Sequence, residues 1–285
     1  MSMRIPLDAV PPGIQLIRAE KNTVAETNSV YRCEGKRNNR DMVFYMKVGK
    51  AGHPTMENEY QVLQELSGHV LPVPRVLWYE RARSEYMALE EMRGTNLSDL
   101  INPGHPLYDP NHIEQLLFAY GEALATIHSL PISWRPFRRT ELYGFIGDEE
   151  QGEDPRNHEV VLWLEVNPVR RTPDVFVHGD LNTANVLFDH SQISGIIDWE
   201  FSGAGWREYD LAWILRQRKN YLNTQRERDS LLDGYESRAA FDPDALRWCE
   251  VLNYLHIANW AGSRFPAYKT FALEKARQMM FAGYD

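Results

Sequence analysis

The sequence has little cysteine and no long apolar run. Its two cysteines among 285 residues, Cys33 and Cys249, give neither a disulfide framework nor the spacing of zinc ligands. The strongest apolar stretches, such as residues 160–164, are far shorter than the roughly 18 to 20 residues that a membrane-spanning helix needs. We therefore expect two reduced, structural thiols in a protein that has no membrane partner.

Secretory and repetitive patterns are missing as well. Residues 1–13 hold no apolar stretch of the roughly 7 to 15 residues that forms the core of a signal peptide, so we expect a cytoplasmic protein. We find no internal repeat or low-complexity tract, and the 43% apolar and 25% charged residues exclude a disordered, collagen-like or fibrous chain. A chain of this length is expected to form two structural units.

Basic residues are too few to balance the acidic ones, and the formal net charge is -9. Residues 1–92 hold 12 Lys and Arg against 12 Asp and Glu, so residues 93–285 hold the other 19 of the 31 basic and 28 of the 40 acidic residues. An acidic surface repels a phosphate backbone and attracts cations, so we expect no nucleic-acid partner and a cationic small molecule. Solubility alone is the alternative explanation of this charge.

The apolar pattern changes along the chain from strands to helices. Short runs rich in β-branched and aromatic residues predict strands at 29–34, 42–48, 75–79 and 86–90. An apolar stripe that begins at Thr55 predicts one helix among them. Asp109 and Pro110 are the predicted cap and first residue of a long core helix, and residues 206–282 also favour helix.

Residues 175–201 enclose polar side chains that have no evident packing role. Two strand-like runs flank a predicted turn at 189–192, with Asn185 just before the first run and Asp198 just after the second. Asp180 precedes Asn185 by five residues. Oxygen ligands of this kind suit Mg²⁺ with a bound polyphosphate, whereas zinc prefers histidine and cysteine.

A metallohydrolase is the alternative interpretation of this segment. His178 and Asp180 have the H-x-D spacing of such a site, but the sequence has no second, well-spaced histidine cluster to complete it.

These residues resemble the motifs of the aminoglycoside phosphotransferase and choline-kinase-like superfamily, small-molecule relatives of the protein kinases. Residues 178–185 (HGDLNTAN) are similar to its catalytic loop, and 196–200 (IIDWE) to its metal-binding motif. Residues 209–213 (YDLAW) resemble the start of a structural helix, and 125–130 (ATIHSL) the end of a long helix.

The resemblance covers most of the chain and implies an α+β, protein-kinase-like fold with two lobes. Residues 1–92 would form an N-lobe, a mainly antiparallel nucleotide-binding sheet with one helix. Residues 93–285 would form a mainly α-helical C-lobe with the catalytic loop and the acceptor site.

The resemblance also implies roles for individual residues. Asp180 would orient the substrate hydroxyl and accept its proton, while Asn185 and Asp198 would hold Mg²⁺ against the nucleotide phosphates. His178 and Asp210 would support the catalytic loop.

A kinase-like site further needs a strand lysine that contacts phosphate and a helical glutamate that holds this lysine. Lys47 lies within a predicted strand, whereas Lys50 falls where that strand should end. Glu59 lies on the apolar stripe of its helix, whereas Glu57 and Glu65 are better placed to face water. A buried charge needs a partner, which Lys47 supplies. A surface lysine and a peripheral glutamate are the alternative.

Two further segments occupy nucleotide-binding positions by resemblance. Residues 86–94 are similar to the linker between the lobes, where the Glu90 carbonyl and the Met92 amide would hold the adenine ring. An ordinary strand end is the alternative there.

The segment expected to cover the phosphates, residues 20–31, contains no glycine, although backbone approaches phosphate most easily without side chains. Asn28 and Ser29 are the candidate phosphate contacts in it. The nucleotide can be ATP or GTP.

The acceptor pocket of this superfamily is often acidic. Glu200 is one candidate contact, and a loop offers Asp148, Glu149, Glu150, Glu153 and Asp154. A solvated run of charge is the alternative for the loop.

The predicted activity is Mg²⁺-dependent transfer of the γ-phosphoryl group of ATP or GTP to a hydroxyl of a small polar molecule. The acceptor would be an aminoglycoside or other antibiotic, an amino alcohol or a sugar-like metabolite, and the enzyme a monomer or homodimer. A pseudokinase-like nucleotide-binding regulator is disfavoured because every polar position of the site is retained. A protein kinase is disfavoured because no activation segment ending in Ala-Pro-Glu follows Asp198.

Overall fold

The computed structural model of the chain forms two compact units. The described residues are 10–22, 28–49, 55–81, 85–132, 155–170, 174–216, 222 and 224–281. The first unit comprises residues 1–95 and 186–201, and the second comprises 96–185 and 202–285. A division into functional lobes at residue 92 stays a prediction.

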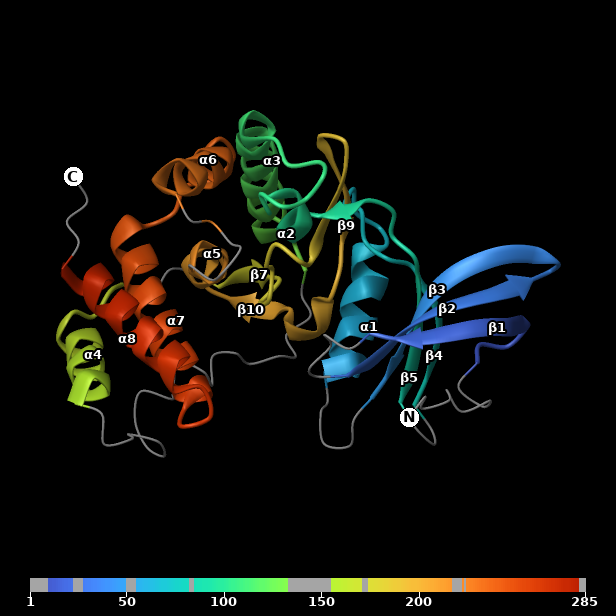
Figure 1. The fold of residues 1–285 in the computed structure, drawn as a ribbon, viewed down its shortest axis with the longest axis horizontal. Coiled ribbons are helices and arrows are strands. Elements are labelled where there is room, and N and C mark those ends of the chain that lie inside the picture. The colour runs from blue at the N-terminus through green and yellow to red at the C-terminus, as the bar shows by residue number, and fades with distance from the viewer. Residues whose placement is uncertain are drawn as a thin grey trace. The chain divides into compact units, whose positions relative to one another are not determined.

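The first unit is built on a five-stranded antiparallel sheet with the strand order β1-β2-β3-β5-β4 (Figure 1). Its strands are β1 (Ile14–Lys21), β2 (Ser29–Arg37), β3 (Arg40–Val48), β4 (Val76–Glu80) and β5 (Tyr86–Glu90). The four predicted strands are present with small changes at their ends. The sequence did not predict β1, because this edge strand is mostly exposed and lacks an alternating apolar pattern.

Alternate residues of the central strands form the core on one face of this sheet. Cys33 on β2, Phe44 and Met46 on β3, and Ala88 on β5 are all almost completely buried there. Successive side chains of a strand point to opposite faces, so Lys47 faces away from this core. The sheet thereby presents Lys47 on the face opposite its main apolar cluster.

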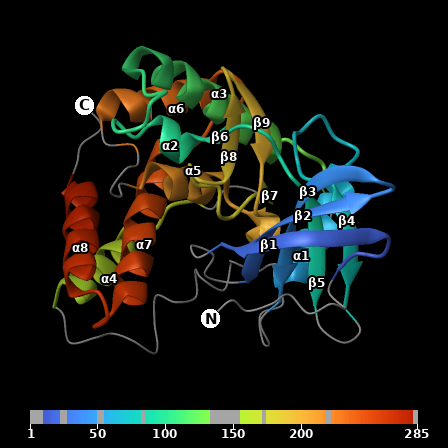
Figure 2. The same cartoon turned by 45° about the vertical axis from the view of Figure 1, so that its right-hand side comes forward.

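One helix, α1 (Thr55–Leu66), accompanies the sheet in this unit (Figures 1 and 2). The predicted apolar stripe is buried, since Met56, Leu63 and Leu66 are at most 2% exposed. Glu59 is fully buried on the same stripe, as the sequence predicted.

A hairpin completes the unit. It joins β8 (Val186–Asp189) to β9 (Gln192–Ile196), with β6 (Thr95–Asn96) as the third strand of this small sheet. The predicted turn at 189–192 is shorter in the structure, because Asp189 pairs with Gln192. His190 adopts a φ of 54°, in the left-handed region that two-residue hairpin turns require. The 3₁₀ turn η3 (Trp199–Phe201) follows.

The second unit is mainly helical, as predicted. Its helices are α2 (Leu97–Leu100), α3 (Pro110–His128), α4 (Pro155–Val166), α5 (Arg207–Leu215), α6 (Gln225–Glu236), α7 (Pro243–Ala261) and α8 (Pro266–Phe281). Strands β7 (Val175–Val177) and β10 (Gly203–Gly205) pair antiparallel. Asp109 caps α3 through the amide of Asn111. Helix α3 packs on α6, and α7 packs on α4 and α8 (Figure 2).

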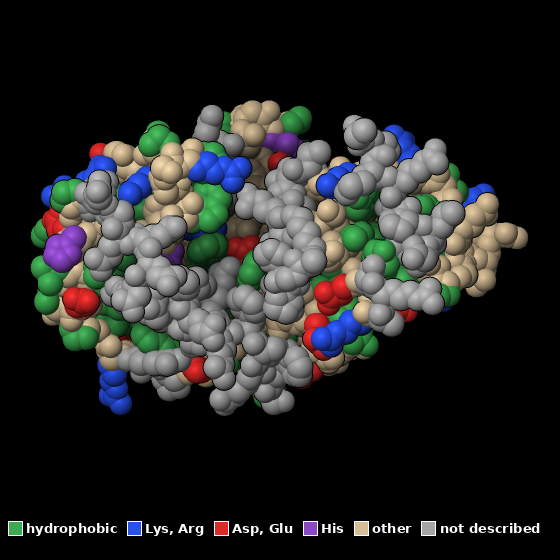
Figure 3. All heavy atoms as spheres, turned by 90° about the horizontal axis from the view of Figure 1, so that it is seen from below, with side chains coloured by type: hydrophobic (Ala, Val, Ile, Leu, Met, Phe, Trp, Pro, Cys, Tyr) green, Lys and Arg blue, Asp and Glu red, His purple; other side chains and the backbone are tan. Residues whose placement is uncertain are grey.

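Cys33 and Cys249 are free and buried, and burial raises the pKa of the Cys33 thiol to about 11. Within the described ranges, no helix is both long and apolar enough to cross a membrane. On the face seen in Figure 3, described acidic side chains lie among lysines and arginines, so the acidic excess forms no single patch in that part of the described surface.

Candidate active site

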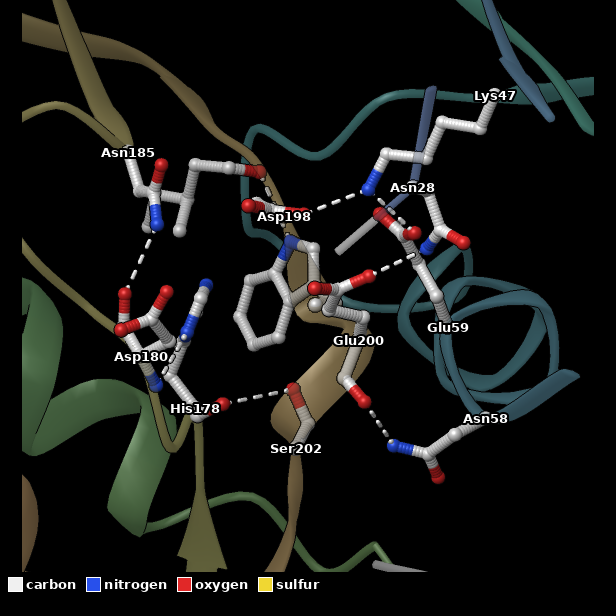
Figure 4. Close-up of polar contacts among 12 residues, drawn as sticks. Asn28, Lys47, Asn58, Glu59, His178, Asp180, Asn185, Asp198, Glu200 and Ser202 are labelled. Carbon is white, nitrogen blue, oxygen red and sulfur yellow. Dashed lines mark hydrogen bonds and ion pairs between the residues drawn. The ribbon is translucent and has the colours of Figure 1, made fainter. Parts of the chain in front are cut away.

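The first unit holds an ion-paired cluster around Lys47. The Nζ atom of this β3 lysine lies 2.6 Å from Glu59 Oε2 and 2.6 Å from Asp198 Oδ1 (Figure 4). The side chains of Lys47 and Glu59 are 9% and 0% exposed, whereas that of Asp198 is 34% exposed. The structure therefore brings together the lysine and glutamate that the sequence paired, and it adds the predicted metal-binding aspartate.

The charges in this cluster depend on one another. Burial alone would lower the pKa of Lys47, but the surrounding carboxylates, with Asp198 contributing most, raise it above its ordinary value. Burial raises the pKa of Glu59 to about 7, although Lys47 favours its charged form. Lys47 is thus firmly cationic, and it offsets part of the effect of burial, which favours the neutral form of Glu59.

Glu200 is the third carboxylate of the cluster. It is 4% exposed, and its Oε2 accepts a hydrogen bond of 2.7 Å from Asn28 Nδ2. Its backbone carbonyl accepts a hydrogen bond of 3.0 Å from Asn58 Nδ2 on α1. The residue proposed from sequence as an acceptor contact therefore lies beside the buried ion pairs.

Asn28 is buried, whereas a side chain that contacts phosphate from an open loop would be exposed. Its side chain is 3% exposed and donates to Glu200, while Ser29 begins β2 and pairs with Val48. No local sequence pattern indicates the Asn28–Glu200 contact, because the two residues are 172 positions apart.

The cluster offers hard oxygen donors for a cation. Glu59, Asp198 and Glu200 each present a carboxylate oxygen, and these oxygens lie within 4.8 Å of one another. Carboxylate oxygens suit Mg²⁺ and Ca²⁺ far better than soft metals. The donor set therefore fits the magnesium that the sequence implied.

The turn after β9 places Asp198 in an uncommon backbone conformation. Its φ is 68°, which aspartate tolerates better than most residues. The neighbouring Trp199 is fully buried, and its Nε1 donates to the Ile196 carbonyl at 2.9 Å. Such backbone outliers persist where the surroundings fix them and are common at active sites.

The second unit holds the HGD loop, residues 178–185. The amide nitrogens of His178 and Gly179 donate to the carboxylate of Asp210 at 2.8 and 2.9 Å. Gly179 has a φ of 79°, a conformation that glycine adopts without strain. The Ser202 hydroxyl donates to the His178 carbonyl at 3.1 Å (Figure 4).

Further hydrogen bonds fix the rest of this loop. Asn185 Nδ2 donates to the Asp180 carbonyl at 2.9 Å, and the His178 ring Nδ1 accepts from the Asp180 amide at 3.3 Å (Figure 4). The Tyr120 hydroxyl on α3 donates to the Leu181 carbonyl at 3.0 Å. His178 and Asp210 therefore both contact the loop backbone, as their predicted supporting roles require.

Asp210 is a buried anion held by its neighbours. Burial opposes its charge, but hydrogen bonding and attraction from His128, with a smaller contribution from His178, lower the pKa of Asp210. His128 Nε2 lies 3.4 Å from Asp210 Oδ2, and the other ring nitrogen lies 2.8 Å from the Tyr235 hydroxyl. Asp210 on α5 is thus joined to α3 through His128, which in turn contacts Tyr235 on α6.

A residue that the sequence did not single out contacts the side chain of Asp180. Trp213 Nε1 on α5 donates to Asp180 Oδ1 at 2.8 Å. Trp213 belongs to the YDLAW motif and follows Asp210 by three residues, so both lie on one face of α5. The three-residue spacing between Asp210 and Trp213 is the sequence feature that could have identified Trp213.

The other predicted residues are placed as follows. Glu90 ends β5, and its amide donates to the Arg75 carbonyl at 2.9 Å, while Met92 is half-buried just beyond it. Their adenine-binding role stays a prediction. The candidate loop acids Asp148, Glu149, Glu150, Glu153 and Asp154 lie outside the described residues.

Comparison with known proteins gives a consistent result. The model of the phosphotransferase enzyme family matches residues 21–249. The aminoglycoside 3'-phosphotransferase of Enterococcus faecalis is 26% identical over 229 residues, which are 71% of this chain and 81% of that protein. A probable acyl-CoA dehydrogenase IBR3 of Arabidopsis thaliana is 26% identical over 269 residues, or 84% of this chain. The chain spans only 32% of that longer relative.

A solved structure is similar over nearly the whole chain. It is a thermostable mutant of aminoglycoside phosphotransferase APH(4)-Ia in a ternary complex with ADP and hygromycin B. Its TM-score is 0.67 at 14% identity, with 95% of each chain covered.

Proposed function

This chain belongs to the phosphotransferase enzyme family, and we propose that it uses Mg²⁺ to transfer the γ-phosphoryl group of ATP or GTP to a hydroxyl of a small, cationic molecule. The family resemblance of the motifs and the α+β, protein-kinase-like fold predicted from them are confirmed. The prediction of a small-molecule kinase is confirmed at the level of the family.

The observation that carries the proposal is the placement of Lys47 against both Glu59 and Asp198. Phosphoryl transfer depends on positioning and charge neutralisation, which a kinase-like site obtains from a held lysine and a metal-binding aspartate. Glu59 is fully buried and holds the lysine, while Asp198 is 34% exposed and accessible to a ligand.

Each side chain has a distinct task in this account. Lys47 binds the nucleotide phosphates, and Asp198 and Asn185 would hold Mg²⁺. When bound, this ion would neutralise charge on the phosphate oxygens. Asp180 orients the acceptor hydroxyl and takes its proton as the acceptor oxygen bonds to the γ-phosphorus and the bond to the departing diphosphate breaks.

Two observations support the proposed class of acceptor: the net charge of the chain and the names of its relatives. The net charge of -9 favours a cationic acceptor. The Enterococcus faecalis relative is named an aminoglycoside 3'-phosphotransferase, and a Pseudomonas aeruginosa relative over 105 residues is named a homoserine kinase. An aminoglycoside, an amino alcohol or a related hydroxylated amine is therefore the proposed acceptor, with antibiotic resistance as the proposed role for the first.

Transfer of labelled γ-phosphate tests the proposal. ATP and GTP are each supplied with Mg²⁺ and a panel of aminoglycosides, macrolides, amino alcohols and sugars. We expect labelling of one acceptor class and loss of labelling in Asp180→Ala with an unchanged circular dichroism spectrum. Undiminished transfer by this variant would overturn the role of Asp180, and failure to bind either nucleotide would overturn the kinase assignment.

A further inference from the structure

Helix α5 contacts the HGD loop through two side chains that lie one turn apart. Asp210 accepts hydrogen bonds from the backbone of the loop, whereas Trp213 donates to the carboxylate of Asp180 at 2.8 Å. The first contact fixes the main chain. The second reaches the side chain proposed to accept the substrate proton.

The indole of Trp213 is itself held in place. The guanidinium carbon of Arg216 lies 3.3 Å from the centroid of the Trp213 ring, and Arg216 is 2% exposed. The Tyr209 ring stacks with the indole at a centroid distance of 6.2 Å and an interplanar angle of 22°. A buried cation over an indole face is a favourable interaction, so these contacts restrict rotation of the ring.

We propose that Trp213 is a positioning residue for phosphoryl transfer, whose indole N–H fixes the carboxylate of Asp180 in its reactive orientation, with Arg216 holding the ring. The inference rests on the proposed function of the site. A hydrogen bond from a neutral donor to a charged acceptor is stronger than one between neutral groups, and it is directional. Trp213 thus holds the carboxylate oxygens of Asp180 in one orientation.

A purely structural role would give a different result. If Trp213 only filled space, replacement by another large aromatic residue would affect this enzyme as little as the same replacement elsewhere in the unit. Trp248 offers the matched site, because it is 8% exposed and its Nε1 donates to the Leu164 carbonyl at 3.1 Å. Trp213→Phe and Trp248→Phe each remove one indole donor and keep an aromatic ring.

The kinetic test compares these two variants. For Trp213→Phe we expect kcat to fall about 10- to 100-fold, with the KM for nucleotide changed less than about twofold. The KM for the acceptor should change as little, because the lost hydrogen bond orients the base and does not bind the substrate. Trp248→Phe should leave kcat and both KM values unchanged. Equal kinetics for the two variants would overturn the inference.

A second measurement does not depend on turnover. The chain has eight tryptophans, and ¹⁵N labelling gives each indole N–H its own resonance. The Trp213 resonance is identified by its loss in Trp213→Phe. We expect Asp180→Asn to displace this resonance and to leave that of Trp248 in place, because only the Trp213 indole donates to the Asp180 carboxylate. If Trp213→Phe does not fold, the indole resonance that Asp180→Asn displaces identifies Trp213. An unchanged set of indole resonances in Asp180→Asn would contradict the contact.

The two tests separate this inference from the proposed function. A wild-type protein without phosphoryl transfer, but with a Trp213 indole resonance that Asp180→Asn displaces, would overturn the proposed function while leaving the contact in place. An active wild-type enzyme whose Trp213→Phe variant matches Trp248→Phe would overturn the inference alone.

Discussion

Lys47 and Asp198, 151 residues apart in the sequence, form an ion pair of 2.6 Å within the first unit. The lysine comes from a central strand of the sheet, and the aspartate comes from the turn after β9. Because Lys47 also pairs with the fully buried Glu59, one ammonium group joins the sheet, helix α1 and the turn after β9.

Replacement of Lys47 by Met should destabilise the protein, because it leaves the buried Glu59 carboxylate without its partner. We expect a loss of about 3 kcal/mol or more in the free energy of unfolding at pH 8. The loss should be smaller at pH 6, since Glu59, whose pKa already stands at about 7 beside Lys47, then takes up a proton. Urea unfolding at both pH values measures this.

The double variant Lys47→Met with Glu59→Gln serves as the control. It should recover much of the lost stability and remove the difference between pH 6 and pH 8. If the single and the double variant lose the same free energy of unfolding, the loss does not come from a Glu59 carboxylate that is buried without a partner.

Replacement of Asp198 by Asn should lower phosphoryl transfer far more than it lowers the stability of the protein. Glu59 stays beside Lys47 in this variant, so we expect the free energy of unfolding to fall less than in Lys47→Met. Phosphoryl transfer should fall more than about 100-fold, because the carboxylate proposed to hold the metal is lost. Turnover assays over a range of Mg²⁺ concentrations, beside denaturant unfolding, check both parts. Near-normal turnover at ordinary Mg²⁺ would argue against the proposed metal role.

The buried carboxylate of Asp210 should make the stability of the folded protein depend on pH. Its pKa is lowered in the folded protein, so its contribution to stability is present above the ordinary pKa of about 4 and is lost as the pH falls through the folded value. We expect Asp210→Asn to be less stable than the wild type at pH 6. That gap should narrow below about pH 4, as measured by thermal unfolding across the range. A gap that stays constant down to pH 3 would show that the charge of Asp210 is not the cause.

Two glycines at the contact of α3 with α6 should resist substitution. A Cβ atom added at Gly121 would overlap the Leu231 carbonyl oxygen, and one added at Gly234 would overlap that of Phe118. Alanine normally stabilises a helix relative to glycine, yet we expect each Gly→Ala variant to lose about 1–3 kcal/mol through overpacking.

Gly68→Ala is the matched control for these glycine variants. Its nearest neighbour would be the Glu65 carbonyl oxygen at 3.9 Å, an ordinary contact. Chemical denaturation of the three variants should show losses at Gly121 and Gly234 only. Gain of stability at either of these two positions would refute the close approach of the helices.

Local patterns in the sequence predicted the elements and part of the site. Glu59 could be paired with Lys47 because a carboxylate on an apolar helical stripe requires a buried partner. The HGD and IIDWE motifs located Asp180, Asn185 and Asp198 because the spacing of those residues is itself the signal.

Contacts between distant segments could not be predicted in this way. Asn28 bonds to Glu200 across 172 residues, and Trp213 reaches Asp180 only because α5 lies against the loop. The spacing of Asp210 and Trp213 on α5 is the one sequence feature that points to the second contact, and no local pattern indicates the first. The same holds for β1, whose partner strand, and not its own exposed side chains, makes it a strand.

³¹P NMR of the wild-type protein incubated with ATP, Mg²⁺ and the acceptor found in the labelling panel follows phosphoryl transfer itself. We expect a new phosphomonoester resonance that grows as the γ-phosphate resonance declines and that is absent with Asp180→Ala. Release of inorganic phosphate alone, without a phosphorylated acceptor, would show that the chain is not a small-molecule kinase for this acceptor.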